Sequence, residues 1–500
     1  MLLRPPKGEP LGLLYSLGNF SIFLGFFIFV SVLVSLSFQE YGTAVRLGMG
    51  SGTAILLGLL MKKLPPAPEG LSLSGAFALA TMVWIHATLV TGFSYWATGY
   101  FNSYLDACFD AMSGYTTTGL TILQDLDHAP EGLQFLRHAV TFLGGQGIIV
   151  LFLMFASQGA AELYQLYVGE GKDERLWPNV LHTARAIWWI SMVYLVLGTA
   201  LLYPVFTNMG MKPVRAFLDA LYLFEGAWST GGFAPHTQNL MYYHSTAVEL
   251  ITMVIFILGS LNFAVHHQVV QGNFREMYKN SEVRSFAFTL FFLTLIATWY
   301  CAKANIYPTF STSFRKVFYQ MASAHTTTGN MTLYARQFVH DWPAPALFCL
   351  ILAMVIGGSA CSTAGGLKGM RLAQAFHSLL FEIRKILLPS RAVSTLKMHH
   401  RKPFLFTQEH GYKALFIISL FMALFAGSTF AGLLAGFPLM DSFFEGVSAA
   451  SNSGLSCGIT TAGMPGFLKV VYIIAMFLGR LEFIAVFAFV GYLFTLAKGR

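Results

Sequence analysis

Four stretches of this 500-residue sequence share one pattern, and that pattern decides the fold. They read DACFDAMSGYTTTG at 106–119, DALYLFEGAWSTGG at 219–232, KVFYQMASAHTTTG at 316–329 and DSFFEGVSAASNSG at 441–454. Each has aromatic residues in its first half and small or hydroxyl residues before its last glycine. Each also lies between two apolar runs. We therefore expect a unit of span, short helix, Ser/Thr/Gly turn and span, repeated four times.

The composition excludes a soluble enzyme. Hydrophobic residues make up 55% of the chain and charged residues 11%, whereas a soluble chain carries about 25% charged residues. The run 11–38 exceeds the roughly 20 apolar residues that cross a bilayer. The net charge of +8 suggests nucleic acid as a partner only for a soluble protein. In a membrane protein it indicates the positive-inside bias, so we expect no nucleic-acid partner.

We predict an all-α integral membrane fold in which four span–pore-helix–span repeats surround a pseudo-fourfold pore. The expected order is a two-span hairpin at 1–70, then repeats at 71–160, 183–270, 284–390 and 412–500. Ten full spans are predicted at 11–38, 44–61, 71–93, 133–157, 183–206, 245–265, 285–302, 344–361, 412–435 and 467–496. The apolar stretches 105–115, 217–228, 314–325 and 441–451 are too short to cross and are candidate re-entrant helices.

Loop charges orient the chain. With a cytoplasmic N-terminus, 21 of the 31 Lys and Arg residues fall inside, 9 fall outside, and Arg480 lies within a span. This orientation places all four Ser/Thr/Gly turns on the outer side. Asp106, Asp219 and Asp441 are expected at the N-termini of the short helices, where acidic groups are stabilising. Lys316 breaks this pattern, and the sequence does not explain it.

The four turns are candidate ion ligands. Irregular backbone at membrane depth is tolerated only where it is buried in protein or lines a water-filled cavity. Glycine permits turns that aim carbonyl oxygens at a common axis, where they replace an ion's hydration shell. The alternative is ordinary small-residue packing between helices. The predicted ion-binding residues are Thr116, Thr117, Thr118, Gly119, Ser229, Thr230, Gly231, Gly232, Thr326, Thr327, Thr328, Gly329, Ser451, Asn452, Ser453 and Gly454.

These segments resemble the Trk/Ktr/HKT superfamily of cation channels and transporters, which have a filter glycine in each of four repeats. Three further stretches are similar to second spans of that family: FLGGQGIIVLFLMF at 142–155, IGGSACSTAGGLKGMR at 356–371 and FLGRLEF at 477–483. Ten spans with an extra N-terminal hairpin are similar to the TrkH subfamily. The match extends from about residue 71 to the end of the chain.

The resemblance implies potassium uptake, with K⁺ as the transported ion and the only metal, at the filter, and no covalent cofactor. It also implies a homodimer in a bacterial-type inner membrane, regulated by a TrkA-like cytosolic nucleotide-binding ring. Two positions depart from the family pattern: Leu455 follows the fourth glycine where proline is usual, and Asn330 follows the third where an apolar residue is common. Sodium transport, poorly selective transport and ion-coupled symport therefore stay open as alternatives.

The run GGSACSTAGG at 357–366 interrupts an apolar span, and we interpret it as a movable gate. Its expected residues are Gly357, Gly358, Gly365, Gly366 and Lys368. Arg480 is costly inside a span, so it should face water or protein. We expect it to act as an electrostatic barrier below the filter. The alternative is an internal pair with Glu482.

Other features have simpler explanations. The basic segment 368–413 suits either anionic lipid headgroups or a docked regulatory ring. The pairs His266–His267 and His399–His400 suggest metal binding, but no further ligands follow at useful spacing, which favours loop solvation. A membrane-embedded enzyme would need convergent acid, base or nucleophile residues at one depth. The sequence offers no such set, so we predict a protein that is not an enzyme.

Overall fold

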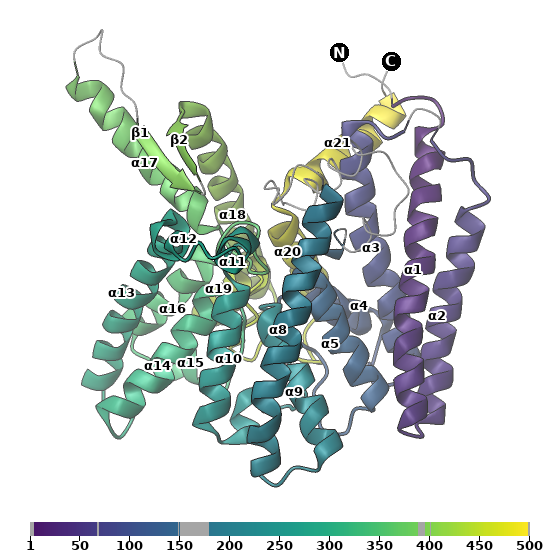
Figure 1. Cartoon of the computed structure of the whole chain (residues 1–500), viewed down its shortest axis with the longest axis horizontal. Helices are drawn as coiled ribbons and strands as arrows, with labels where there is room; N and C mark the ends of the chain where they lie inside the picture. Colours follow the sequence, from purple (N-terminus) through teal and green to yellow (C-terminus); the bar gives the residue numbers. More distant parts are fainter. Residues whose placement is uncertain are drawn as a thin grey trace.

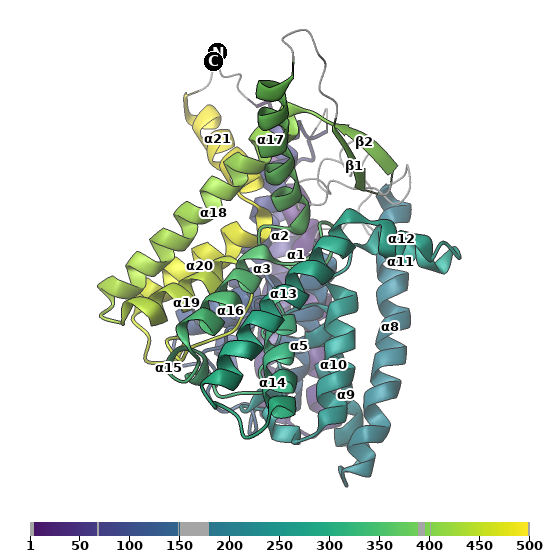
Figure 2. The same ribbon diagram turned by 90° about the vertical axis from the view of Figure 1, so that its left-hand side faces the viewer.

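The computed structural model describes residues 5–67, 70–148, 150, 180–388, 396–400 and 402–498, and these are mostly helical (Figure 1). Several of the longer helices run roughly along one direction, and others are strongly tilted to it (Figures 1 and 2). Six of the described helices are long and apolar enough to span a membrane, or up to eight if each of two bent pairs counts as one span. The described part of the chain is therefore built as a polytopic membrane protein.

The first two helices, α1 (Glu9–Ser37) and α2 (Tyr41–Met61), form an antiparallel hairpin. Glycines bring their backbones together: a Cβ on Gly18 would lie 2.9 Å from the carbonyl oxygen of Gly58. The Ser51 hydroxyl donates to Gly25 O at 2.8 Å across the same contact. Small residues at such crossings are typical of helices that pack in lipid.

The order span, short helix, turn and span then repeats four times. The first unit contains α3 (Leu73–Ala97), α4 (Tyr104–Tyr115) and α5 (Glu131–Gln146). The second contains α8 (Val180–Asn208), α9 (Pro213–Trp228), η1 (Asn239–Tyr243), α10 (Thr246–Gly259) and α11 (Phe263–Val270), and α12 (Arg275–Lys279) links it to the third. The third contains α13 (Ser281–Lys303), α14 (Phe310–His325), α15 (Gln337–His340), α16 (Ala344–Ile356) and α17 (Gly369–Leu387). The fourth contains α18 (Gln408–Leu434), α19 (Leu439–Ala450), α20 (Gly466–Leu481) and α21 (Ile484–Lys498).

The prediction of continuous second spans is wrong at 245–265 and 467–496. Helices α10 and α11 meet at 98°, and α20 and α21 meet at 106°. The first break places Asn262 as the N-cap of α11, its side chain accepting from Ala264 N; the second places Glu482 and Phe483 at positive φ. The predicted span 344–361 also stops early, at Ile356. Most of 147–157 lies outside the described residues.

The basic segment contains a feature absent from the prediction. Strands β1 (Leu396–His400) and β2 (Lys402–Phe406) form an antiparallel hairpin between α17 and α18. Phe406 packs against α17 through Met370 and Phe381. In both views this hairpin, α17 and α21 lie at one end of the molecule, opposite α9, α14 and α15 (Figures 1 and 2).

Candidate ion pathway

Each of the four short helices α4, α9, α14 and α19 ends at its predicted turn, with Thr116, Ser229, Thr326 and Ser451 as C-caps. The next residue is left-handed in every turn, at φ values from 52° to 56°. Two residues later comes the glycine, again at positive φ, from 63° to 88°. Only glycine adopts the second conformation at low cost. The four turns therefore have one backbone conformation.

The four turns close into a ring. A Cβ on Gly119 would lie 2.5 Å from the carbonyl oxygen of Gly231, in the second turn. One on Gly232 would lie 2.0 Å from Thr328 O, and one on Gly329 would lie 2.4 Å from Ser453 O. One on Gly454 would lie 1.8 Å from Thr118 O, which returns to the first turn. Each glycine thus packs against the backbone of the next repeat, and fifteen of the sixteen predicted filter residues are buried, while Gly119 is partly buried.

The interrupted segment between α16 and α17 lies against all four turns. The Thr363 hydroxyl accepts from Thr230 Oγ1 at 3.1 Å, and Thr117 Oγ1 lies 3.5 Å from Thr363 O. The amide of Gly365 donates to Thr327 Oγ1 at 2.6 Å, and the amide of Gly366 donates to Ser451 O at 2.9 Å. The segment 357–368 therefore contacts every repeat from one position. Thr363 is central to these contacts, and the sequence pattern did not single it out.

The two predicted basic gate residues bind backbone carbonyls. Arg480, at the end of α20, donates to Thr363 O at 2.6 Å and to Gly144 O at 2.7 Å. It thereby connects the fourth repeat to the first and to the interrupted segment. Lys368 donates to Ala364 O within that segment. Glu482, the alternative partner of Arg480, forms an ion pair with Arg371 of α17.

The charges on the short helices form pairs between repeats, which accounts for Lys316. Asp106 of α4 accepts from Lys469 of α20 at 2.5 Å. Lys316 of α14 occupies the aligned position and donates to Glu249 of α10 at 2.8 Å, so the same contact has the opposite polarity. The prediction that Asp219 lies at a helix N-terminus is wrong, because α9 begins six residues earlier at Pro213.

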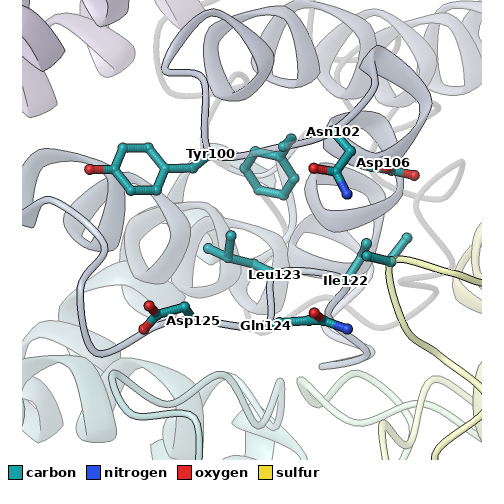
Figure 3. Close-up of a pocket in the computed structure, with 9 residues that line it drawn as sticks. Tyr100, Asn102, Asp106, Ile122, Leu123, Gln124 and Asp125 are labelled. Carbon is teal, nitrogen blue, oxygen red and sulfur yellow. The ribbon is translucent and has the colours of Figure 1, made fainter.

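We call the segments that follow the four turns the outer segments, after the side on which the sequence predicts them. In the first repeat, Ile122 to Asp125 face Tyr100, Asn102 and Asp106 across a pocket of about 210 Å³ (Figure 3). Next to this pocket, Asp127 lies 2.6 Å from His236 Nδ1 in the segment after the second turn. Desolvation raises the pKa of the Asp127 carboxyl, but hydrogen bonds from His236 and Thr237 outweigh it and keep this pKa below its ordinary value.

Among the residues that the structure describes, no group of three or more His, Cys, Asp or Glu side chains is placed to hold a metal ion. The ring of turns presents backbone carbonyls and hydroxyls instead.

Comparison with known proteins identifies the family. The sequence model of the TrkH family, described as a cation transport protein, matches residues 67–491. The chain belongs to the TrkH family. The predicted resemblance is therefore confirmed.

Similar proteins align with most of the chain. An uncharacterised cation transporter of Methanocaldococcus jannaschii is 28% identical over 486 residues, which is 97% of this chain and 96% of that protein. The Trk system potassium uptake protein TrkG of Escherichia coli is 28% identical over 418 residues, which is 81% of this chain and 82% of TrkG.

A solved member of the TrkH family has the same fold. The crystal structure of the potassium transporter TrkH from Vibrio parahaemolyticus superposes with a TM-score of 0.81, at 24% identity over 95% of this chain and 97% of that one. The predicted all-α fold, with four span–pore-helix–span repeats after an N-terminal hairpin, is thereby confirmed.

Proposed function

We propose that this chain carries K⁺ into the cell through the centre of the ring formed by its four turns. The observation that carries the proposal is the closed sequence of contacts from Gly119 to the second turn and back from Gly454 to the first. Four equivalent backbone turns around one axis supply carbonyl oxygens from four directions. Such a set replaces the hydration shell of a cation without acidic side chains.

The short helices support the same ion. Each points its C-terminal end at the ring, where the helix dipole places partial negative charge. Glycine stands at the aligned position in all four turns, which resembles the potassium-selective pattern of the family. Relatives named Trk system potassium uptake proteins agree with this choice. Sodium or poorly selective transport is the second candidate, because Asn452 replaces the threonine found at the same place in the other turns.

We further propose that the segment 357–368 is the gate. It crosses beneath all four turns and is held there by hydrogen bonds from Thr230, Gly365 and Gly366. Gly357 and Gly366 adopt positive φ at its two sides, and a Cβ on Gly357 would lie 2.3 Å from Gly365 O. In this position the segment blocks the path of an ion directly below the ring. Conduction requires the segment to move aside.

Arg480 is proposed to hold the gate in place as well as to repel cations. Its guanidinium joins Thr363 of the gate to Gly144 at the end of α5. A fixed positive charge beneath a cation site raises the energy of an ion that passes it. Lys368 adds a second positive charge at the inner end of the gate.

The orientation and partners complete the proposal. The basic helix α17 and the β1–β2 hairpin lie at the same end as α21, far from the outer segments that follow the turns (Figure 1). We therefore assign that end and the N-terminus to the cytoplasm of a bacterial-type inner membrane. A TrkA-like nucleotide-binding ring would dock there on the basic segment. The chain is proposed to act as a homodimer, which a mass measurement in detergent tests.

Flux into proteoliposomes tests the proposal directly. Purified protein, reconstituted with outward K⁺ or Na⁺ gradients, should accumulate a tracer cation faster with K⁺ than with Na⁺. Equal rates with the two ions would contradict the potassium assignment. No flux with either ion, also after addition of the cognate nucleotide-binding partner, would contradict transport.

One substitution tests the first turn. Gly119→Ser should lower total flux, because its Cβ would lie 2.5 Å from Gly231 O, and the flux that remains should shift toward Na⁺, as the family pattern implies. The matched control is Gly42→Ser, because nothing lies within 4 Å of a Cβ at Gly42. An unchanged ratio of K⁺ to Na⁺ flux in Gly119→Ser would contradict a filter at this turn.

A further inference from the structure

Three of the four short helices carry a polar side chain nine residues before the last glycine of their turn. These residues are Asp110 in α4, Gln320 in α14 and Glu445 in α19, and all three side chains are fully buried. Each contacts the outer segment that follows its own turn. The aligned position in α9 is Leu223. In these three repeats, the buried polar side chain therefore joins the short helix to the segment that follows its turn.

Glu445 makes the most of these contacts. Its Oε1 accepts from Ser456 Oγ at 2.8 Å, from Thr460 Oγ1 at 2.5 Å and from the Thr460 amide at 3.0 Å. Its Oε2 accepts from the Cys457 amide at 2.8 Å and from Cys457 Sγ at 3.2 Å. Residues 456–460 are therefore wrapped around one carboxylate, and Ser456 is only two residues beyond Gly454.

The other repeats use the same position with different chemistry. Asp110 accepts from Thr121 Oγ1 at 2.5 Å, and its second oxygen accepts from Arg137 Nε at 2.8 Å. Gln320 donates from Nε2 to Thr332 Oγ1 at 2.9 Å. Thr121 and Thr332 follow the filter glycines of their repeats by two and three residues.

The second repeat replaces this contact with another one. Its outer segment contains His236, whose Nε2 lies 2.9 Å from Asp219 Oδ2. Asp219 also accepts from the Tyr243 hydroxyl at 2.9 Å. Asn239 donates to Gly232 O at 3.2 Å. A buried polar side chain of α9 therefore holds the outer segment here as well, from one turn earlier in the helix.

We propose that Glu445 is a positioning residue for ion selection. It fixes the segment that follows the fourth turn, and this segment in turn fixes the backbone of Gly454. This inference rests on the proposed function. Selection between cations by carbonyl oxygens depends on where those oxygens are held. The fourth turn relies on Glu445 most, because one carboxylate meets five donor groups.

The chemistry of the partners predicts which substitution fails. An ionised carboxylate only accepts hydrogen bonds, and each group around Glu445 can donate one. Glutamine has the same shape, but its NH₂ would face donors and leave buried groups unpaired. At Gln320 the amide is suitable because the Thr332 hydroxyl accepts. Glu445→Gln should therefore disturb the fourth turn although it removes no volume.

The experiment compares K⁺ and Na⁺ flux of three variants with the wild-type chain in proteoliposomes. Glu445→Gln is the main variant, and Thr460→Val removes one donor while leaving the carboxylate. The matched control is Glu409→Gln, because Glu409 is an exposed residue of α18 that pairs with Lys413. Size-exclusion profiles and the melting temperature report folding.

We expect Glu445→Gln to lower the K⁺/Na⁺ flux ratio by about fivefold or more, with a smaller fall in Thr460→Val and no change in Glu409→Gln. If Glu445→Gln does not fold, the K⁺/Na⁺ flux ratio of Thr460→Val tests the positioning role in its place. A selective wild-type chain with an unchanged ratio in the folded variants would overturn the positioning role alone. A wild-type chain without selectivity would overturn the proposed function as well, which keeps the two failures distinct.

Discussion

The ring of four turns is regular, whereas the layer directly beneath it, formed by the breaks in the second spans, is irregular. In the ring, four segments from different repeats have one backbone conformation, and each touches the next in the same way. Beneath it, the second spans break differently: α10 and α11 meet at 98°, α20 and α21 meet at 106°, and the third repeat has a segment without helix between α16 and α17. In the function proposed above, an ion on the axis meets four similar backbone ligand sets in the upper layer, whereas the single segment 357–368 closes the lower one.

The largest expected effect comes from breaking the symmetry of the ring. Gly454→Ala adds a Cβ 1.8 Å from Thr118 O at a residue with φ 77°. The atoms that the new Cβ would meet belong to the backbone of Thr118 and Gly119, which cannot move aside at low cost. The K⁺ flux should therefore fall by roughly tenfold or more. Gly491→Ala in α21 is the control, because nothing lies within 4 Å of its added Cβ. Normal flux in Gly454→Ala would show that the ring is not the pathway.

The lower layer should respond in the opposite direction. Arg480→Ala removes the hydrogen bonds to Thr363 O and Gly144 O and the positive charge beneath the ring. Cation flux should rise by about threefold, and the K⁺/Na⁺ ratio should stay as it is because the turns are untouched. Arg480→Lys keeps the charge and should change flux less. A lower flux, or an altered ratio with an unchanged rate, would contradict separate gate and filter layers.

The gate itself offers a related test. Cys361 lies in the segment 357–368 and is partly exposed. The amide of the neighbouring Ala360 donates to Glu282 of α13 at 3.0 Å, so a crosslink from Cys361 to a cysteine introduced near Glu282 should hold the segment and stop flux, and reduction should restore it. The Cys361→Ser protein with the same introduced cysteine is the control. Full flux in completely crosslinked protein would disprove gating by this segment.

A smaller effect is expected where charges join the repeats. Lys316→Glu opposes Glu249 and should lower the free energy of unfolding by about 1–3 kcal/mol, since the pair is largely buried. The double variant Lys316→Glu/Glu249→Lys adopts the polarity of the Asp106–Lys469 contact and should recover most of that loss. Lys413→Glu, in an exposed pair, serves as the control. If the double variant does not regain the free energy of unfolding, the Lys316–Glu249 and Asp106–Lys469 contacts are not equivalent.

The smallest effect concerns the outer segments and depends on pH. The Asp127 pKa lies below its ordinary value of 3.8. The stabilisation is therefore fully present above that value and is lost as the pH falls through the lower pKa of the folded protein. Asp127→Asn should lower the melting temperature slightly at neutral pH, because the group is partly exposed. This difference should shrink in acid, and a difference that grew would contradict the assignment.

The sequence alone predicts the upper layer well and the lower layer poorly. Short helices that end in Ser, Thr and Gly are visible because a glycine at a fixed offset is a local signal. The breaks after Gly259 and Leu481 occur within apolar runs, where hydropathy is the same for a bent and a straight helix. Phe483 at φ 69° has no sequence signature, since its conformation is imposed by tertiary contacts.

Long-range pairing explains the other differences. Lys316 has no partner nearby in the sequence, because the fold pairs it with Glu249, 67 residues earlier. Thr363 looks like one of several small residues in its run, and only the folded chain brings it to Thr230 and Arg480. Glu445 and Gln320 could have been noticed as an aligned polar pair, but their partners lie in loops whose path the sequence does not reveal.

The position of a bound cation tests the central claim most directly. Crystals of the protein grown in Rb⁺, which substitutes for K⁺ and scatters anomalously, should show a peak on the axis enclosed by Gly119, Gly232, Gly329 and Gly454. Exchange into Na⁺ should remove it. A peak elsewhere in the molecule, or an equally occupied site in both salts, would contradict a potassium filter formed by the four turns.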